Sequence, residues 1–194
     1  MENVKRHKNE NLHLKGNFVF TKAEISTDKQ KKLERKIRQK RDNNQDCLRL
    51  INKLNRMCNI NKYYEKNLIT DAGKNMVANN LASAAPDTPD INLNKTAVGS
   101  GDSQPSASDT TLESEDYRRN TASSTSTGTD FNLTAFYGAT EVSGTLKEHG
   151  LFANGGGSAD SGVLFSRVLL DESSGGITKS NSETLTIDYS VNIN

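Results

Sequence analysis

TLTIDYSVNI, residues 184–193, is the clearest strand pattern in the sequence. Its apolar residues are Leu185, Ile187, Tyr189, Val191 and Ile193. They alternate with polar residues, so a β-strand would place them all on one face. The run therefore predicts a strand with one buried face and one solvated face.

Upstream of this strand, further short runs favour extended structure. They cover residues 91–98, 117–123, 129–137, 145–153 and 163–170. Gly and Ser residues at 138–144, 154–157 and 173–176 are typical of the turns between strands. About six short strands with such turns predict a mainly β fold, a small antiparallel β-sandwich.

One short helix is predicted beside these strands, over residues 71–83. Thr70 or Asp71 can cap its start, and its apolar residues fall on one side. Pro86 and Pro89 follow its end. We expect this helix to pack against the sandwich.

Several motifs occur in a characteristic order along the last two thirds of the chain. They are KNLITDAGKNMVANNLA at 66–82, VGSG and DTTLESEDYRR within 98–119, GTLKEHGLFANGG at 144–156, LFSRVLL at 164–170 and ITKSNSETLTIDYSVNI at 177–193. Together they resemble a family of small structural proteins of tailed bacteriophages, the tail-fibre, baseplate or general virion proteins. The resemblance covers about residues 62–194. It implies a sandwich with a helix over one end and a role in packing and attachment, with no catalytic motif to carry over.

The charge is divided unevenly along the chain. Residues 1–58 hold 16 Lys and Arg against 7 Asp and Glu, a net charge of +9, and residues 59–194 hold 9 against 17, a net charge of −8. We therefore expect two parts, an assembly and attachment arm at 1–60 and a β-sandwich domain at 61–194. A basic arm can meet nucleic acid, a membrane surface or an acidic protein, and the acidic body of a neighbouring subunit is the simplest partner.

The arm is predicted to contain a long basic helix over residues 28–58. Positions 33, 37, 40, 44, 47, 51, 54 and 58 follow the spacing of a coiled-coil seam, with Asn44 as a polar register position. A break within residues 41–46, giving two helices, remains the alternative. Cys47 and Cys58 are expected to be reduced, because eleven residues of helix separate them by about 16 Å.

An extended segment at residues 12–20 precedes the helix and also alternates. It is predicted to pair with another subunit or to fold back on the body. The hydrophobic content of 32% is low, which suggests that part of the chain is buried only against partners. The predicted subunit interface comprises Leu12, Leu14, Phe18, Phe20, Leu33, Ile37, Asn44, Cys47, Ile51 and Leu54.

The residue patterns do not favour catalysis, a cofactor or a metal. The two glycines at 99 and 101 and the three glycines at 155–157 lack the remaining residues of phosphate-binding motifs. His149 is interpreted as a structural histidine. Glu113, Glu115 and Asp116, next to Arg118 and Arg119, are interpreted as a salt-bridged acidic patch rather than a Ca²⁺ site or a glycosidase pair.

The sequence therefore predicts a non-enzymatic structural component of a tailed-phage virion, made in the host cytoplasm without a secretory signal or membrane insertion. A tail-fibre, baseplate or collar attachment protein, assembled through its arm as a trimer or larger homo-oligomer with other virion proteins, is the first expectation. The alternatives are a head-decoration or head-fibre protein, a host-surface binding module, a depolymerase, and a protein whose basic arm contacts nucleic acid, although nucleic acid is not the expected partner.

Overall fold

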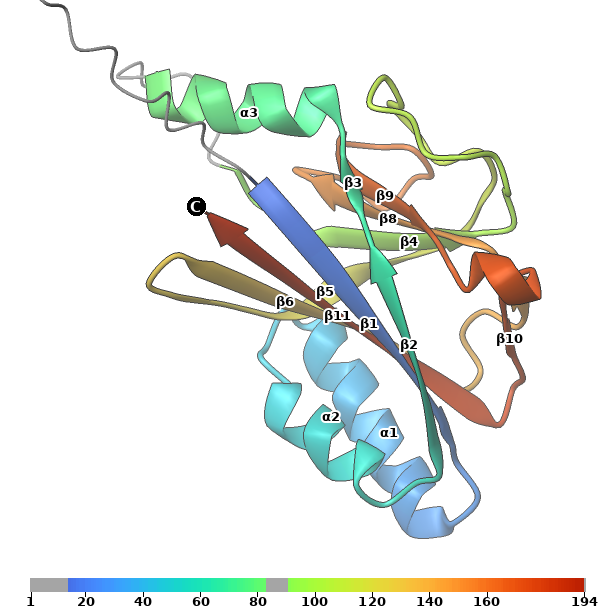
Figure 1. The fold of residues 1–194 in the computed structure, drawn as a ribbon. Helices are drawn as coiled ribbons and strands as arrows, with labels where there is room; N and C mark the ends of the chain where they lie inside the picture. The colour runs from blue at the N-terminus through green and yellow to red at the C-terminus, as the bar shows by residue number, and fades with distance from the viewer. Residues whose placement is uncertain (1–13, 83–90, 194) are drawn as a thin grey trace, which may run out of the picture.

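The computed structural model of the chain describes residues 14–82 and 91–193. The fold is mainly β, as predicted, and it contains three α-helices where two were expected from the sequence (Figure 1). The strands are β1 (Leu14–Glu24), β2 (Ile60–Lys66), β3 (Leu68–Ile69), β4 (Lys95–Gly99), β5 (Glu115–Thr127), β6 (Asp130–Tyr137), β7 (Gly144–Leu146), β8 (Glu148–Ala153), β9 (Val163–Leu169), β10 (Ile177–Lys179) and β11 (Glu183–Ile193). The helices are α1 (Asp28–Asp42), α2 (Leu48–Asn55), α3 (Asp71–Ala82) and the short 3₁₀ helix η1 (Glu172–Ser174).

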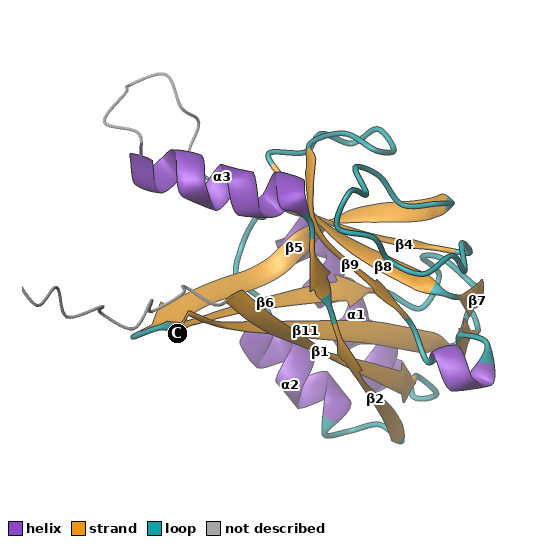
Figure 2. Ribbon diagram, turned by 45° about the horizontal axis from the view of Figure 1, so that its top comes forward, coloured by secondary structure: helices purple, strands orange, loops and turns teal. Residues whose placement is uncertain are grey.

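Nine of the strands form one continuous sheet. Its order is β2-β1-β11-β6-β5-β4-β8-β9-β3, and every recorded pairing is antiparallel. The long strand β5 pairs with β6 along one part and with β4 along another, so it belongs to both halves of the sheet. The sheet bends until β1 and β2 approach β3 and β9, which makes it nearly closed (Figure 2). The hydrogen bonding thus joins the predicted strands into one bent sheet instead of two separate ones.

The main core lies between the two facing halves of the sheet. Phe18 of β1 stacks on Tyr189 of β11, with ring centroids 4.5 Å apart, and meets the edge of His149 from β8 at 4.8 Å. The alternation of the terminal strand works as predicted, because Leu185, Ile187 and Tyr189 are all buried in this core. The predicted helix at 71–83 is confirmed as α3, which packs against β9.

The extended segment near the N-terminus is part of this sheet. Strand β1 lies between β11 and β2, and Phe18 and Phe20 are buried in the core of the same molecule. Folding back on the body, one of the two outcomes left open for this segment, is the one observed. The prediction that Phe18 and Phe20 need a neighbouring subunit is therefore wrong, and the boundary predicted at residues 60/61 divides strands that share one sheet.

The predicted long helix is broken into α1 and α2. The chain turns between Asp42 and Leu48, where Asn44 has a left-handed φ of +53°, a conformation that Asn tolerates better than most residues. The alternative of two helices is thus confirmed, and the continuous coiled-coil helix is wrong. A heptad seam and the sheet-facing stripe of a short helix have nearly the same spacing, so the pattern alone does not identify the partner.

The two helices form a hairpin on the outer face of the sheet (Figures 1 and 2). A second core lies beneath them and contains Ile25, Ile37, Cys47, Ile51, Leu54, Ala122 and Phe136. Strand β6 is therefore covered on both faces, because Phe136 points to the helices while Leu133 and Ala135 face the main core. Among the described residues, no helix is both long enough and apolar enough to span a membrane.

Candidate interaction surface

The helical hairpin begins with a capping box. The backbone N–H of Gln30 donates to the Thr27 hydroxyl at 3.2 Å, and the backbone N–H of Thr27 donates to the Gln30 side chain at 2.8 Å. The same Gln30 side chain donates to the carbonyl of Met57 at 2.6 Å. This last bond ties the start of α1 to the chain just beyond α2, so the two helices are held together at their open end.

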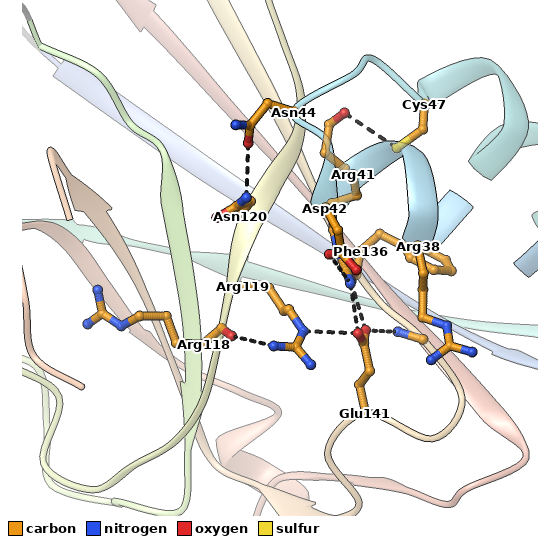
Figure 3. A network of polar contacts seen from close by, with 12 residues as sticks. Arg38, Arg41, Asp42, Asn44, Cys47, Arg118, Arg119, Asn120, Phe136 and Glu141 are labelled. Atoms are coloured by element: carbon orange, nitrogen blue, oxygen red, sulfur yellow. Dashed lines mark hydrogen bonds and ion pairs between the residues drawn. The ribbon is translucent and has the colours of Figure 1, made fainter. Parts of the chain in front are cut away.

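A buried ion network anchors the hairpin to the sheet (Figure 3). Arg41, at the end of α1, is fully buried and donates two hydrogen bonds of 2.7 Å to Glu141 and one of 2.6 Å to the carbonyl of Phe136. Arg119 of β5 adds a bond of 2.9 Å to Glu141, and the backbone N–H of Gly138 adds one of 2.6 Å. Burial alone would raise the pKa of Glu141, but the bonds and the charge of Arg41 outweigh it and lower this pKa to about 2.

With the apolar side and Arg41 facing the sheet, the hairpin turns nine of its ten other cations to solvent, and the tenth, Arg38, pairs with Glu34 at 2.7 Å. Residues 28–57 carry eleven Lys and Arg against four Asp and Glu, a net charge of +7. The exposed cations are Lys29, Lys31, Lys32, Arg35, Lys36, Lys40, Arg49, Lys53 and Arg56. None of these nine makes an ion pair within the described part of the chain. We call this solvent-facing side of α1 and α2 the basic hairpin surface.

A small cleft opens between the two helices on this surface. It has a volume of about 150 Å³. Its lining residues are Lys29, Lys32, Leu33, Lys36, Lys53 and Met57. Four lysines thus line the cleft together with two apolar side chains, a combination that suits a carboxylate carried on a short aliphatic stem.

Carboxylates gather in a different part of the molecule, around the loop between β4 and β5. Glu148, fully buried on β8, accepts hydrogen bonds from the backbone N–H groups of Gly101, Glu113 and Ser114, and from Arg167 at 2.9 Å. Arg167 also pairs with Asp109 at 2.8 Å. These bonds hold the loop in one conformation, so its outer carboxylates have defined positions.

The loops around the β4–β5 loop carry a strongly negative net charge. We define the acidic end by its carboxylates, which are Asp102, Asp109, Glu113, Glu115, Asp116, Glu148, Asp160, Asp171 and Glu172. Hydrogen bonds connect these segments. The backbone N–H of Asp160 donates to Glu115, and the side-chain amide of Gln104, in the loop between β4 and β5, donates to Glu172. Three cations, Arg118, Lys147 and Arg167, pair with members of this set, which leaves a net charge of −6.

Two of the residues considered for catalysis, Glu115 and His149, have structural partners. Glu115 pairs with Arg118 through two contacts of 2.7 Å, as the interpretation of a salt-bridged patch requires, whereas Asp116 is exposed. His149 is fully buried, and its Nε2 lies 2.6 Å from the Thr96 hydroxyl, a structural role as predicted. Burial lowers the pKa of His149 to about 3, so the ring is neutral near pH 7. Within residues 14–82 and 91–193, no three His, Cys, Asp or Glu side chains are grouped to hold a metal ion.

The residues predicted as a subunit interface lie in several different parts of the structure. Phe18 and Phe20 lie in the main core, and Ile37, Cys47, Ile51 and Leu54 lie beneath the hairpin, so these six are not available to a neighbour. Leu33 is partly buried at the cleft, and Asn44 is exposed and accepts a hydrogen bond of 2.9 Å from Asn120. Leu12 and the side chain of Leu14 lie outside the described part of the structure.

The cations of α1 were recognisable in the sequence as a basic run, but those of α2 were not predicted to join them. Arg49, Lys53 and Arg56 recur at steps of four and three, a spacing that would have placed them on one helical face once α2 was separated from α1. Comparisons of the chain with protein-family models, with curated proteins and with solved structures found no match.

Proposed function

We propose that the chain is a non-enzymatic structural component of a tailed-phage particle, of the tail-fibre, baseplate or collar attachment type, and that the basic hairpin surface attaches it to other particle proteins. The ordered motifs of residues 66–193 support the particle assignment. Their family resemblance implies a sandwich, and the body does have two facing halves around one core, which a single bent sheet supplies.

One observation carries the attachment role. Nine exposed cations lie on a hairpin that a buried ion network fixes to the sheet, and none of the nine has an anionic partner in the described chain. Arg41 anchors the hairpin, whereas the side chains of the nine exposed cations make no hydrogen bond or ion pair within the described residues. Like charges held together on a rigid surface attract an acidic partner and speed its encounter.

The buried carboxylates support a structural role better than catalysis. Glu115, Glu141 and Glu148 are each paired with an arginine, so no carboxyl of the three is left to act as a general acid. A depolymerase needs a carboxyl pair flanking a bound sugar. Digestion of capsule or glycan by the purified chain would contradict the proposal.

The proposal is tested on particles. The tagged full chain would be expressed during phage growth, and the particles would be purified by nuclease treatment and density gradient before their proteins are identified by mass spectrometry. We expect the chain in the particle fraction, and we expect the Lys32→Glu/Lys36→Glu variant to be depleted from it. The Lys66→Glu/Lys74→Glu variant changes the charge equally on β2 and α3 and should be incorporated normally. Absence of the unmodified chain from particles would refute the assignment.

Nucleic acid is the second candidate partner of the same surface. The nine cations would suit phosphates, but residues 21–62 contain no aromatic side chain to stack on a base. The apolar floor formed by Leu33 and Met57 also suits a protein side chain better than a phosphate backbone. These features favour a protein partner, and binding to DNA is an outcome that the next experiment separates.

A further inference from the structure

We propose that the partner of the basic hairpin surface is the acidic end of a second copy of this chain, so that copies associate head to tail. The inference deepens the proposed attachment role by naming the partner. It assigns a basic surface and an acidic surface of the molecule to each other.

The positions of the two surfaces support this pairing. In Figure 1 the hairpin of α1 and α2 lies at the bottom of the molecule, and the loop between β4 and β5 lies at the upper right. Because they are apart, one copy does not neutralise its own charges, and both surfaces remain available to different neighbours.

The charges are matched in size and opposite in sign. The hairpin, residues 28–57, has a net charge of +7. The acidic end, with nine carboxylates against three cations, has a net charge of −6. Asp116 and Asp160 are exposed and make no ion pair in the described chain, and Glu172 is exposed and bonded only to a neutral amide. These three carboxylates are therefore free to meet lysines of a neighbour.

Both surfaces are rigid enough to form a specific contact. The hairpin is held by Arg41 and Glu141, and the acidic loop is held by Glu148 and Arg167. Preorganised side chains lose less conformational entropy on binding than mobile ones. The cleft between α1 and α2, rimmed by Lys29, Lys32, Lys36 and Lys53, has room for an Asp or Glu side chain.

A second copy explains the observations better than a nucleic acid. A nucleic acid would use only the hairpin, whereas a second copy uses both surfaces. When two different surfaces pair, a dimer still leaves one surface of each kind unoccupied. Association therefore continues into a ring or an open filament, according to the rotation between neighbours.

The test measures self-association of the purified full chain by sedimentation velocity and light scattering. At about 10 mM ionic strength, where the Debye length is about 30 Å, the mass should rise with concentration beyond that of a dimer. At about 1 M salt, where the Debye length is about 3 Å, the chain should be monomeric.

Charge-reversal variants identify the surfaces. Lys32→Glu/Lys36→Glu on the hairpin and Asp116→Lys/Glu172→Lys on the acidic end should each abolish association, while Lys66→Glu/Lys74→Glu should not. Mixing the two association-deficient variants should restore it, because each then offers a surface complementary to one on the other. Circular dichroism and thermal melting verify that every variant is folded, and the neutral Lys32→Gln/Lys36→Gln variant should weaken association less than the reversal.

Other results would overturn the pairing. These are a monomer at every salt concentration, association that ignores the hairpin charges, failure of the mixed variants to associate, or a monomer that binds duplex DNA with a steep salt dependence. A chain that is found in particles but does not self-associate would refute this inference alone. A chain that self-associates but is absent from particles would refute the proposed function alone.

Discussion

Arg41 and Glu141 face each other through two hydrogen bonds of 2.7 Å across the boundary between helix α1 and the sheet, and the arginine is fully buried (Figure 3). They are separated by a hundred residues along the chain. A bidentate pair of this kind fixes both distance and orientation, because the planar guanidinium matches the carboxylate. The pair therefore determines where the basic hairpin surface points.

Removing Arg41 should destabilise the protein strongly. Arg41→Ala leaves the carbonyl of Phe136 and part of Glu141 without their partner, and breaking a buried pair from one side costs about 3–5 kcal/mol. Chemical denaturation measures the loss. The control is Arg35→Ala, an exposed cation of the same helix, which should change the unfolding free energy by less than about 0.5 kcal/mol. Equal effects of the two substitutions would show that the pair does not anchor the hairpin.

Glu141 should make the free energy of unfolding fall at acidic pH. Its pKa is about 2 in the folded chain against an ordinary value of 4.5, so its contribution is complete above pH 4.5 and is lost as the pH falls from 4.5 towards 2. The full contribution is about 3 kcal/mol. Unfolding free energy measured across this range should fall less in Glu141→Gln than in the unmodified chain, and parallel curves would contradict the assignment.

His149 should produce a second pH dependence at higher pH. Burial lowers its pKa from 6.5 to about 3, so the unfolded chain binds a proton between these values and the folded chain does not. Stability is thus complete above pH 6.5 and falls as the pH drops below it, by up to about 1.4 kcal/mol per pH unit. His149→Phe should remove this slope between pH 6.5 and pH 5, even if the lost bond to Thr96 lowers stability at every pH. An unchanged slope would mean that His149 is protonated in the folded protein.

Phe18 distinguishes a core strand from a subunit interface. Because Phe18 is buried against Tyr189 and His149 of the same molecule, Phe18→Ala should cost about 3–5 kcal/mol of unfolding free energy. Tyr64→Ala on the neighbouring strand β2 is the control, since Tyr64 is 69% exposed, and it should cost less than about 0.5 kcal/mol. A small effect of Phe18→Ala in dilute monomer would restore the idea that β1 is completed by a neighbour.

Local patterns predicted most of the strands and the helix α3. The alternation of Leu185, Ile187 and Tyr189 identified β11, and the cap at Thr70 or Asp71 identified the start of α3 within one residue. Strand β2 was missed, because its residues are mostly exposed and carry no clear alternation of apolar side chains. The run at 145–153 was predicted as one strand and is two, since Lys147 separates β7 from β8.

The candidate site was only partly predictable. The basic run of α1 was visible in the sequence, but its union with Arg49, Lys53 and Arg56 needs the turn at Asn44, whose left-handed conformation no spacing rule predicted. Glu141 lies in a short loop with no motif of its own. Its role arises from contacts with Arg41 and Arg119, which are distant in sequence.

The order of the residues is enough to predict the mainly β class, the polar and apolar faces of most elements, and the separation of positive and negative charge along the chain. These follow from side-chain periodicity and composition, which are local properties. Which apolar faces meet depends on contacts between distant parts of the chain, and these are visible only in the folded molecule. Phe18 and Ile37 have patterns that suit another subunit as well as their own sheet, and the choice depends on long-range pairing of β1 with β11 and of α1 with Phe136. Because the sheet buries the apolar stripe of the hairpin, the cations are the side chains that remain exposed to solvent.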